Sequence, residues 1–370
     1  MENIDWSNIR NEFPLVNEYK YFDSASFGLI SNGTADVSKN FIADLLHKGE
    51  YDRKLLFERI EEVKKSVTEL INGIDGYISL VSSFTVGFQS IVSQIKTKSN
   101  VLILENDYPV LFNFWKSSGH ILLVHQMGNT NAIDYQKLRN DVIQRKIDIL
   151  AISHVNAYNG VLLDLGLISE ICSSLGILVI VDATQSVGHI PIDVSALNID
   201  ILICSCYKWC LAGFGIGFLY VSKKAMKQLF IENPSYKIDY AVNEFQNKRE
   251  NFYTSKIFEY GHYNYSSIFS LGTSIDQIMN IGIENIHERN LLLSKHFYES
   301  IEAFDLNTTI EDKNIASGIF CLKEPPNLKE YLQSQSIKVA YKENRIRISI
   351  NFYNNAEDIN YLIDAISSVK

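Results

Sequence analysis

The residues best suited to chemistry lie close together near the middle of the sequence. Residues 177–181 form a continuous apolar, β-branched run, which predicts a strand covered on both faces. Asp182 follows this run directly, and a second apolar run at 201–204 is soon followed by Lys208. Because α/β sheets place their functional groups at the carboxyl ends of strands, we expect the carboxylate and the amine to share one site.

An acid and a lysine at neighbouring strand ends suit pyridoxal 5′-phosphate (PLP). The aldehyde of this cofactor forms a Schiff base with a lysine, and an acid keeps its pyridine nitrogen protonated, so that the ring acts as an electron sink. We assign these two catalytic roles to Lys208 and Asp182. For either residue alone, the simpler interpretation is a surface lysine or a helix-capping aspartate. Asp182 and Lys208 occur together with Gln185 and Ser205 at fixed offsets, and this combination is much less likely to arise by chance.

Two motifs in this stretch carry a family resemblance. VDATQSVGH at 181–189, followed by CSCYKWCLAGFGIGFLYVS at 204–222, resembles the class V aminotransferase group of fold-type I PLP enzymes. That group also contains cysteine desulfurases, kynureninase and isopenicillin N epimerase-like proteins. Weaker matches extend from YFDSASFG at 21–28 to RIRISINFYN at 345–354.

The resemblance implies an α/β fold of type I, with a large domain on a mostly parallel seven-stranded sheet and a smaller C-terminal α+β domain. The β–α alternation in the first half of the chain independently favours such a sheet. We expect residues 1–20 to pack with the small domain, residues 21–250 to form the PLP-binding domain, and residues 251–370 to contain an interface loop and the small domain.

Several further residues match cofactor contacts of the family. Thr85 and Ser83 fall on a turn before a predicted helix. Hydroxyls and free N–H groups at such a position suit a phosphate. Simple helix capping is the alternative for both residues. Tyr108 falls where the family stacks a ring on the pyridine. Ser205 matches a phosphate-binding serine, and Tyr207 replaces the usual histidine before the lysine, as in the epimerase-like branch.

The turn SHVNAYNGV at 153–161 departs from the family pattern in one place. His154 matches, either as a cofactor contact or as a structural histidine. Ala157, however, stands where an asparagine or serine often meets the phenolic oxygen of the cofactor. The sequence leaves open whether Asn156 or Asn159 substitutes for it, and Gln185 is the surer partner of that oxygen.

The resemblance implies a homodimer with shared active sites. FEYGHYNYSSIFSL at 258–271 resembles the loop that completes the phosphate site of the partner subunit. His262 and Asn264 are the expected cofactor ligands on it, and an ordinary interface or surface loop is the alternative. Helices are expected only afterwards, at 274–282 and 286–304.

The substrate is expected to be a small-molecule amino acid. In the family, an arginine in an RxS motif holds the α-carboxylate with its planar guanidinium, and this motif falls on Arg347, with Arg345 as the fallback. The FDSAS turn at 22–26 resembles one that lines the substrate pocket, which makes Ala25 and Ser26 candidate substrate contacts.

Length and composition describe an ordinary globular enzyme. The chain has 370 residues, of which 46% are apolar, and a net charge of −9. No basic stripe offsets this charge, which argues against binding to nucleic acid. The N-terminal residues lack an apolar signal core, and no run approaches the roughly 20 apolar residues that span a bilayer. We therefore expect a cytoplasmic protein with no membrane partner.

Five cysteines are scattered without a disulfide pattern. Cys204, Cys206 and Cys210 cluster, but no histidine or further cysteine nearby completes a tetrahedral metal site. Small buried thiols are the favoured interpretation, and no metal is expected. Cys321 lies on a predicted strand, and the loop before the RxS motif contains no cysteine. This disfavours the persulfide-forming reaction of desulfurases, which use a mobile cysteine in that loop.

The chemistry is less determined than the cofactor. The amine of Lys208 is suited to remove or return the Cα proton of an amino acid. The simplest resulting activity is that of an aminotransferase. The alternatives are a carbon–sulfur lyase that needs no acceptor cysteine, an epimerase, or a PLP-fold binding module without catalysis.

Overall fold

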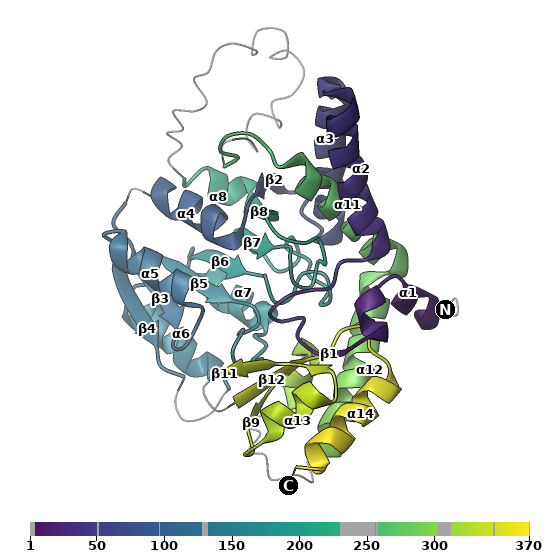
Figure 1. The fold of residues 1–370 in the computed structure, drawn as a ribbon. Helices are drawn as coiled ribbons and strands as arrows, with labels where there is room; N and C mark the ends of the chain where they lie inside the picture. Colours follow the sequence, from purple (N-terminus) through teal and green to yellow (C-terminus); the bar gives the residue numbers. More distant parts are fainter. Residues whose placement is uncertain are drawn as a thin grey trace.

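The structure is a computed structural model that describes residues 4–49, 52–95, 97–127, 132–229, 256, 258–301, 312–342 and 345–369 (Figure 1). Its helices are α1 (Trp6–Asn11), η1 (Pro14–Asn17), α2 (Asn32–Lys48), α3 (Arg53–Leu70), α4 (Phe84–Gln94), α5 (Pro109–Ser117), α6 (Tyr135–Gln144), α7 (Leu165–Ser173), α8 (Lys223–Met226), α11 (Tyr265–Ile281), α12 (Ile283–Ile301), η3 (Asp312–Ser317), α13 (Leu328–Ser334) and α14 (Ala356–Ser367). Its strands are β1 (Lys20–Tyr21), β2 (Gly76–Val81), β3 (Asn100–Leu104), β4 (Ile121–His125), β5 (Ile149–Ser153), β6 (Leu178–Asp182), β7 (Ile201–Ser205), β8 (Gly217–Ser222), β9 (Ile319–Lys323), β10 (Ile337–Lys338), β11 (Ala340–Lys342) and β12 (Arg345–Ser349).

A seven-stranded sheet forms the centre of the larger part of the molecule. Its strand order is β2-β8-β7-β6-β5-β3-β4. Every neighbouring pair from β7 to β4 is parallel, and only β8 runs antiparallel to its two neighbours. The prediction of a mostly parallel seven-stranded sheet is therefore confirmed.

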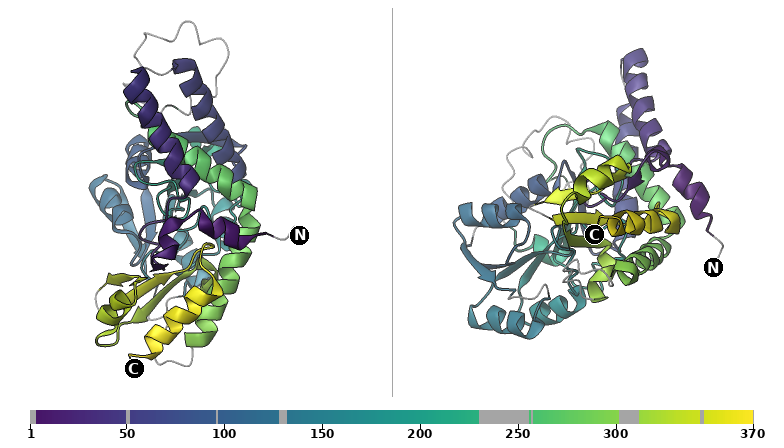
Figure 2. Two further views of the ribbon diagram at one scale, coloured as in Figure 1. Left: turned by 45° about the vertical axis from the view of Figure 1, so that its right-hand side comes forward. Right: turned by 60° about the horizontal axis from the view of Figure 1, so that its bottom comes forward.

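The apolar runs in the sequence are explained by helices on both faces of this sheet (Figures 1 and 2). All residues of β5, β6 and β7 are buried. Alternate side chains enter two different cores: Leu150 and Val179 pack in one core with residues of α3, α7 and α11, whereas Ile149 and Ile180 pack in the other with residues of α4 and α5. Strands covered in this way need apolar residues at every position.

The smaller part of the molecule is built on a three-stranded antiparallel sheet, β11-β12-β9, with its own core. Helices α12 and α14 pack together beside it (Figure 2). The N-terminal segment joins this part: β1 pairs with β10, and Asp23 bridges to Ser349 of β12. Arg10 and Lys20 both reach the buried carboxylate of Asp358 in α14, at 2.6 and 2.8 Å.

One helix begins earlier than the sequence predicts. Helix α11 starts at Tyr265, so the second half of the segment expected as a loop at 258–271 is helical. Asn264 caps it by accepting a hydrogen bond from the backbone N–H of Ser267. The helix packs on α2 and α3, and this burial outweighs the weak helical pattern of the serine-rich first turns. The expected domain boundary at residue 250 lies outside the described residues.

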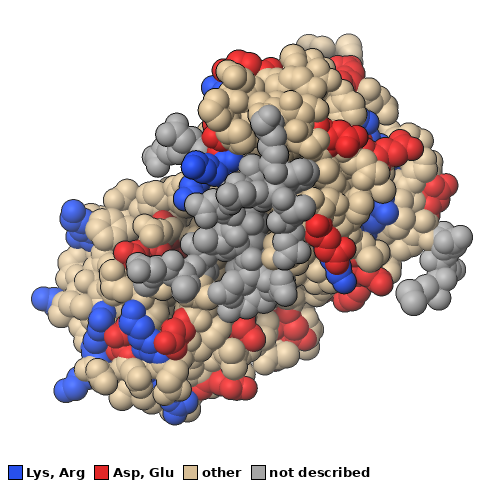
Figure 3. Space-filling model, turned by 90° about the horizontal axis from the view of Figure 1, so that it is seen from below, with Lys and Arg blue, Asp and Glu red and all other residues tan. Residues whose placement is uncertain are grey.

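Acidic and basic side chains are interspersed in small groups on the face shown in Figure 3. Within the described parts of the chain, no helix combines the length and apolar character that crossing a lipid bilayer requires.

The contact of the N-terminal segment with α14 gives a first prediction. Asp358→Ala leaves the guanidinium of Arg10 and the ammonium of Lys20 without their shared carboxylate, and breaking a buried ion pair costs about 3–5 kcal/mol. We expect urea denaturation to show a loss of this size in the free energy of unfolding. Asp364→Ala changes an exposed aspartate on the same helix and serves as the control. Equal stability of the two variants would contradict a stabilising role for the contact.

Candidate active site

The structure brings Asp182 and Lys208 to the same edge of the central sheet. Asp182 is the last residue of β6, and Lys208 lies in the turn after β7, the parallel neighbour of β6. Burial raises the pKa of the Asp182 carboxyl from 3.8 to about 6, while the N–H of Thr184 (2.9 Å) and the charge of Lys208 act in the opposite direction. The carboxyl group is therefore held in a dry environment in which a cationic partner stabilises its ionised form.

A second buried acid, Asp107, supports this edge and was missed in the sequence analysis. Its two oxygens accept hydrogen bonds from the backbone N–H groups of Tyr108 (2.6 Å) and Ser153 (2.9 Å), so it ties the end of β3 to the end of β5. Burial raises its pKa, and its charge also raises the pKa of Asp182. Its place directly before Tyr108 was the only signal in the sequence.

The predicted phosphate ligands meet at the N-terminus of α4. Ser83 is the N-cap of this helix and accepts from the N–H of Val86 at 3.3 Å. Ser205 lies against the same helix end, where its Oγ accepts from the N–H of Phe84 at 2.7 Å. Thr85 is half-buried in the first turn. Hydroxyls and N–H groups gathered at the start of a helix form an anion site.

Two ring-bearing candidates lie near Asp182. Tyr108 is half-buried at the start of α5, and its pKa is raised by burial and then by Asp182. His154 donates its backbone N–H to the carbonyl of Asp182 at 2.9 Å. Its imidazole is buried, its Nδ1 has no hydrogen-bond partner, and burial lowers its pKa to about 4. His154 is thus a neutral imidazole at neutral pH.

The side chain of Gln185 is held by two partners. Its Nε2 donates to the carbonyl of Ala25 at 3.0 Å, and its Oε1 accepts from the indole of Trp209 at 2.7 Å. This leaves one amide N–H for a ligand. Trp209, which the sequence analysis did not single out, also stacks on His189 with ring centroids 3.7 Å apart. Its position next to Lys208 was the available signal.

The turn of Asn156 is held by its own side chain. The Asn156 oxygen accepts from the N–H groups of Tyr158 (2.9 Å) and Asn159 (3.2 Å), and its Nδ2 donates to the carbonyl of Asn106 (2.9 Å). The Asn159 oxygen accepts from the N–H of Val161 at 3.1 Å. Both asparagines therefore shape the loop that lacks the usual cofactor contact at Ala157.

Arg347 reaches from β12 toward the N-terminal turn and the loop after β5. It is buried, whereas Arg345 on the same strand is exposed. One guanidinium nitrogen donates to the carbonyl of Ala157 at 2.6 Å, and the other donates to Ser26 Oγ at 2.5 Å. Arg347 Nη2 also lies 3.7 Å from the carboxylate of Asp23, while its Nε has no hydrogen-bond partner.

Aromatic rings surround the lysine. The ammonium of Lys208 lies 5.5 Å from the ring centroid of Tyr207, which stacks on Phe214 at 5.1 Å. Phe27 packs edge-on against Phe214 at 5.5 Å. Gly28 donates its N–H to the carbonyl of Tyr207 at 2.9 Å. A Cβ at Gly28 would lie 1.7 Å from the carbonyl oxygen of Lys208, so only glycine permits this close approach.

The two candidates before α11 are exposed in this chain. His262 and Asn264 both face solvent, and Asn264 caps the helix. The segment that carries them is anchored by Glu259, whose carboxylate binds Lys64 at 2.8 Å and accepts from the N–H of Leu80 at 2.7 Å. The exposed position is compatible with contact to a second subunit.

The donor set fits PLP. The charge of the Lys208 amine acts on a buried carboxyl group whose raised pKa calls for a cationic partner. The start of α4 gathers backbone N–H groups and the hydroxyls of Ser83 and Ser205, which suits a phosphate, and a neutral buried imidazole has an unused nitrogen. These are the groups that an aldehyde, a pyridine nitrogen and a phosphate require.

Comparison with known proteins assigns the family. The sequence model described as Aminotransferase class-V matches residues 21–362. The chain is 22% identical to the uncharacterized aminotransferase YcbU of Bacillus subtilis, over 97% of this chain and 96% of the relative. It is 25% identical to a probable cysteine desulfurase of Borreliella burgdorferi, over 98% of this chain and 95% of the relative.

The fold is shared with solved structures. One is the cystine C–S lyase C-DES in complex with its reaction product cysteine persulfide, with a TM-score of 0.85, 17% identity, and coverage of 96% of this chain and 99% of that one. The chain therefore belongs to the class V aminotransferase family and is a PLP-dependent enzyme of fold type I that acts on an amino acid.

Proposed function

We propose that Lys208 and Asp182 are the catalytic residues and that the reaction is, most simply, amino transfer. The observation that carries the proposal is that the amine and the buried carboxyl group lie at one sheet edge. When bound, PLP supplies an electron sink for the electron pair left at Cα. The carboxylate of Asp182 holds a proton on the ring nitrogen. The amine of Lys208 takes the proton from Cα and returns one during turnover.

Arg347 is the proposed ligand of the substrate α-carboxylate. Its guanidinium is desolvated and already held by Ser26 and Ala157, so little side-chain entropy is lost when a carboxylate binds. Asp23, at 3.7 Å, offsets its charge in the free protein. We propose that Ser26 and the neighbouring Ala25 line the pocket of the substrate.

Ser83, Thr85 and Ser205 are the proposed phosphate ligands, with the ring of Tyr207 beside them. Tyr108, His154 and Gln185 are proposed to contact the rest of the cofactor. Of the buried histidines, His154 and His189 are uncharged and only weakly basic at neutral pH, because burial lowers the pKa of His154 to about 4 and that of His189 to about 3. This leaves the proton transfer at Cα to Lys208.

We also propose a homodimer in which His262 and Asn264 complete the phosphate site of the partner. The support is their exposed position next to the start of α11. The ring N–H of His262 and the side-chain amide of Asn264 would add hydrogen-bond donors to the phosphate site.

A carbon–sulfur lyase is the second candidate. A curated relative is a probable cysteine desulfurase, and a solved structure of this fold is a cystine C–S lyase. Cys321 lies within β9, and the sequence before Arg347 lacks the mobile cysteine that desulfurases use. A lyase without an acceptor cysteine remains the sulfur chemistry that this chain supports.

A panel of amino acids tests these proposals. With PLP-loaded enzyme, amino transfer dependent on a keto acid would support the first candidate, whereas pyruvate and sulfide released from cysteine or cystine would support the second. Lys208→Ala should abolish the visible absorbance of bound PLP and lower the rate on the order of a thousandfold. Lys223→Ala, at an exposed lysine on α8, is the control. Unchanged turnover in Lys208→Ala would reject the assignment.

The buried carboxyl group predicts a pH-dependent stability of the cofactor-free protein. The folded pKa of Asp182, about 6, lies above the ordinary value of 3.8, so its stabilising contribution is present below pH 4 and is lost as the pH rises through 6. The full difference amounts to about 3 kcal/mol. Relative to wild type, Asp182→Asn should gain stability from pH 4 to pH 7 in chemical denaturation. The exposed Asp36→Asn should show no such trend, and a flat difference for Asp182→Asn would contradict the prediction.

Arg347→Lys should raise KM for the amino acid by about 10- to 100-fold, because a lysine cannot reproduce two parallel charge-assisted hydrogen bonds. The visible absorbance of bound PLP should remain. Arg345→Lys, at the exposed first residue of the same strand, is the matched control and should change KM less than about twofold. The reverse ranking would move the carboxylate site to Arg345.

A further inference from the structure

Three sulfur atoms converge in the core directly beside the lysine turn. Cys204 is the second-last residue of β7, and Cys206 and Cys210 lie on either side of Lys208 in the sequence. The three Sγ atoms all lie within 4.8 Å of one another, and each side chain is at most 1% exposed. The sequence analysis placed the three cysteines in one cluster and favoured small buried thiols, and the structure shows their sulfur atoms close together in the core.

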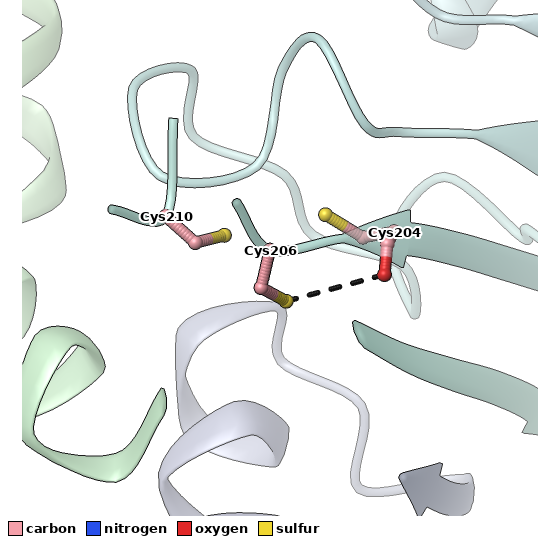
Figure 4. A group of neighbouring side chains, drawn as sticks. All are labelled: Cys204, Cys206 and Cys210. Atoms are coloured by element: carbon pink, nitrogen blue, oxygen red, sulfur yellow. Dashed lines mark hydrogen bonds between the residues drawn. The ribbon is translucent and has the colours of Figure 1, made fainter. Parts of the chain in front are cut away.

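The three thiols make only weak hydrogen bonds, and that of Cys204 is turned toward the carbonyl of Ser205 at 3.5 Å. Figure 4 shows the Sγ atoms of Cys204 and Cys210 pointing toward each other, whereas the Sγ of Cys206 is turned toward the carbonyl oxygen of Cys204. The thiol of Cys206 is turned toward the carbonyl of Cys204 at 3.9 Å, and that of Cys210 toward the carbonyl of Val187 at 3.3 Å. Thiol donors make weak hydrogen bonds, so little opposes a rotation of these sulfurs toward one another.

The number and type of ligands select the ion. Metal–thiolate bonds of about 2.3 Å place three sulfurs of a trigonal site about 4 Å apart, close to the spacing of this cluster. Among the described residues, no histidine, aspartate, glutamate or further cysteine joins the three sulfurs. Zinc prefers four ligands in a closed site, whereas soft thiolates without oxygen or nitrogen ligands select Cu(I).

We propose that Cys204, Cys206 and Cys210 form a binding site for one soft monovalent cation of the Cu(I) class. Binding replaces S–H protons, which pass to solvent, by metal–sulfur bonds, and no change of oxidation state is involved. Two thiolates and one thiol around Cu(I) carry a net charge of −1, which limits the cost of burying the complex. The site is distinct from the residues that the proposed function uses.

The site would fasten the turn that carries the catalytic amine. Cys206 and Cys210 flank Lys208 and Trp209, and Ala212 donates its N–H to the carbonyl of Cys206 at 3.0 Å. A ligand that joins both sides of this turn restricts its opening. A bound ion therefore raises the melting temperature through ligand linkage.

Anaerobic Cu(I) titration tests the proposal. Because the sulfurs are buried, the full-length reduced protein is refolded from denaturant with Cu(I) buffered by bathocuproine disulfonate and is then freed of unbound metal. We expect one retained Cu(I) per chain, a near-ultraviolet charge-transfer band, and an X-ray absorption spectrum with three sulfur neighbours at about 2.3 Å. Cys204→Ser and Cys210→Ser should each lower the affinity at least about tenfold.

Cys172→Ser and Cys321→Ser are the matched controls, since these two cysteines lie outside the cluster. They should retain one Cu(I), and circular dichroism verifies that each variant is folded. Failure of the wild-type chain to retain Cu(I) would overturn the proposal, as would equal retention by the cluster variants. If a cluster variant does not fold, fewer than three sulfur neighbours in the wild-type X-ray absorption spectrum would have the same consequence. Turnover and PLP absorbance are not needed for any of these readouts.

Discussion

The structure of the site depends on a carboxyl group kept out of water next to an amine. Asp182 is buried at the end of β6, and its raised pKa shows that burial outweighs the stabilisation from Thr184 and Lys208. Ionising such a buried carboxyl group costs free energy in the cofactor-free protein, and a cationic partner lowers this cost. The proposed partner is the protonated ring nitrogen of PLP. Exclusion of water destabilises the carboxylate in the cofactor-free protein. The same exclusion of water would strengthen its interaction with a protonated ring nitrogen.

The proposed substrate end of the site lies where the N-terminal turn contacts both the large sheet region and β12. Ala25 is bound to Gln185 of the large sheet region, and its N–H donates to Ser349 of β12 at 2.9 Å. Next to it, Ser26 holds Arg347, and Gly28 packs on the lysine turn. This single turn therefore links the proposed carboxylate ligand, Arg347, to the turn of the proposed catalytic amine, Lys208. A shift of the small sheet would change both contacts together.

The sequence predicted the elements whose signal is local. Apolar runs placed the buried strands, and the strand ends placed Asp182 and Lys208, because parallel strands align their carboxyl ends. Trp209 and Asp107 were missed. Their partners, the amide of Gln185 and the backbone N–H of Ser153, are distant in the sequence, and such contacts leave no periodic pattern. The start of α11 was missed because packing on α2 and α3, and not its own serine-rich turns, decides it. The convergence of Cys210 with Cys204 likewise depends on a turn that spacing alone does not specify.

The mouth of the site explains why a second subunit is expected to cover it. Phe27 and Phe214 are 50% and 65% exposed, although they pack on each other beside Tyr207. Burying a large apolar side chain contributes about 1.5–3 kcal/mol, and contiguous exposed apolar groups mark interaction surfaces. Ser267 of α11 donates to the carbonyl of Phe214 at 3.1 Å, so the segment that carries the proposed phosphate ligands is tied to the same surface. In the proposed homodimer, one interface would then both exclude water from the amine and complete the anion site, which makes catalysis and assembly depend on the same residues.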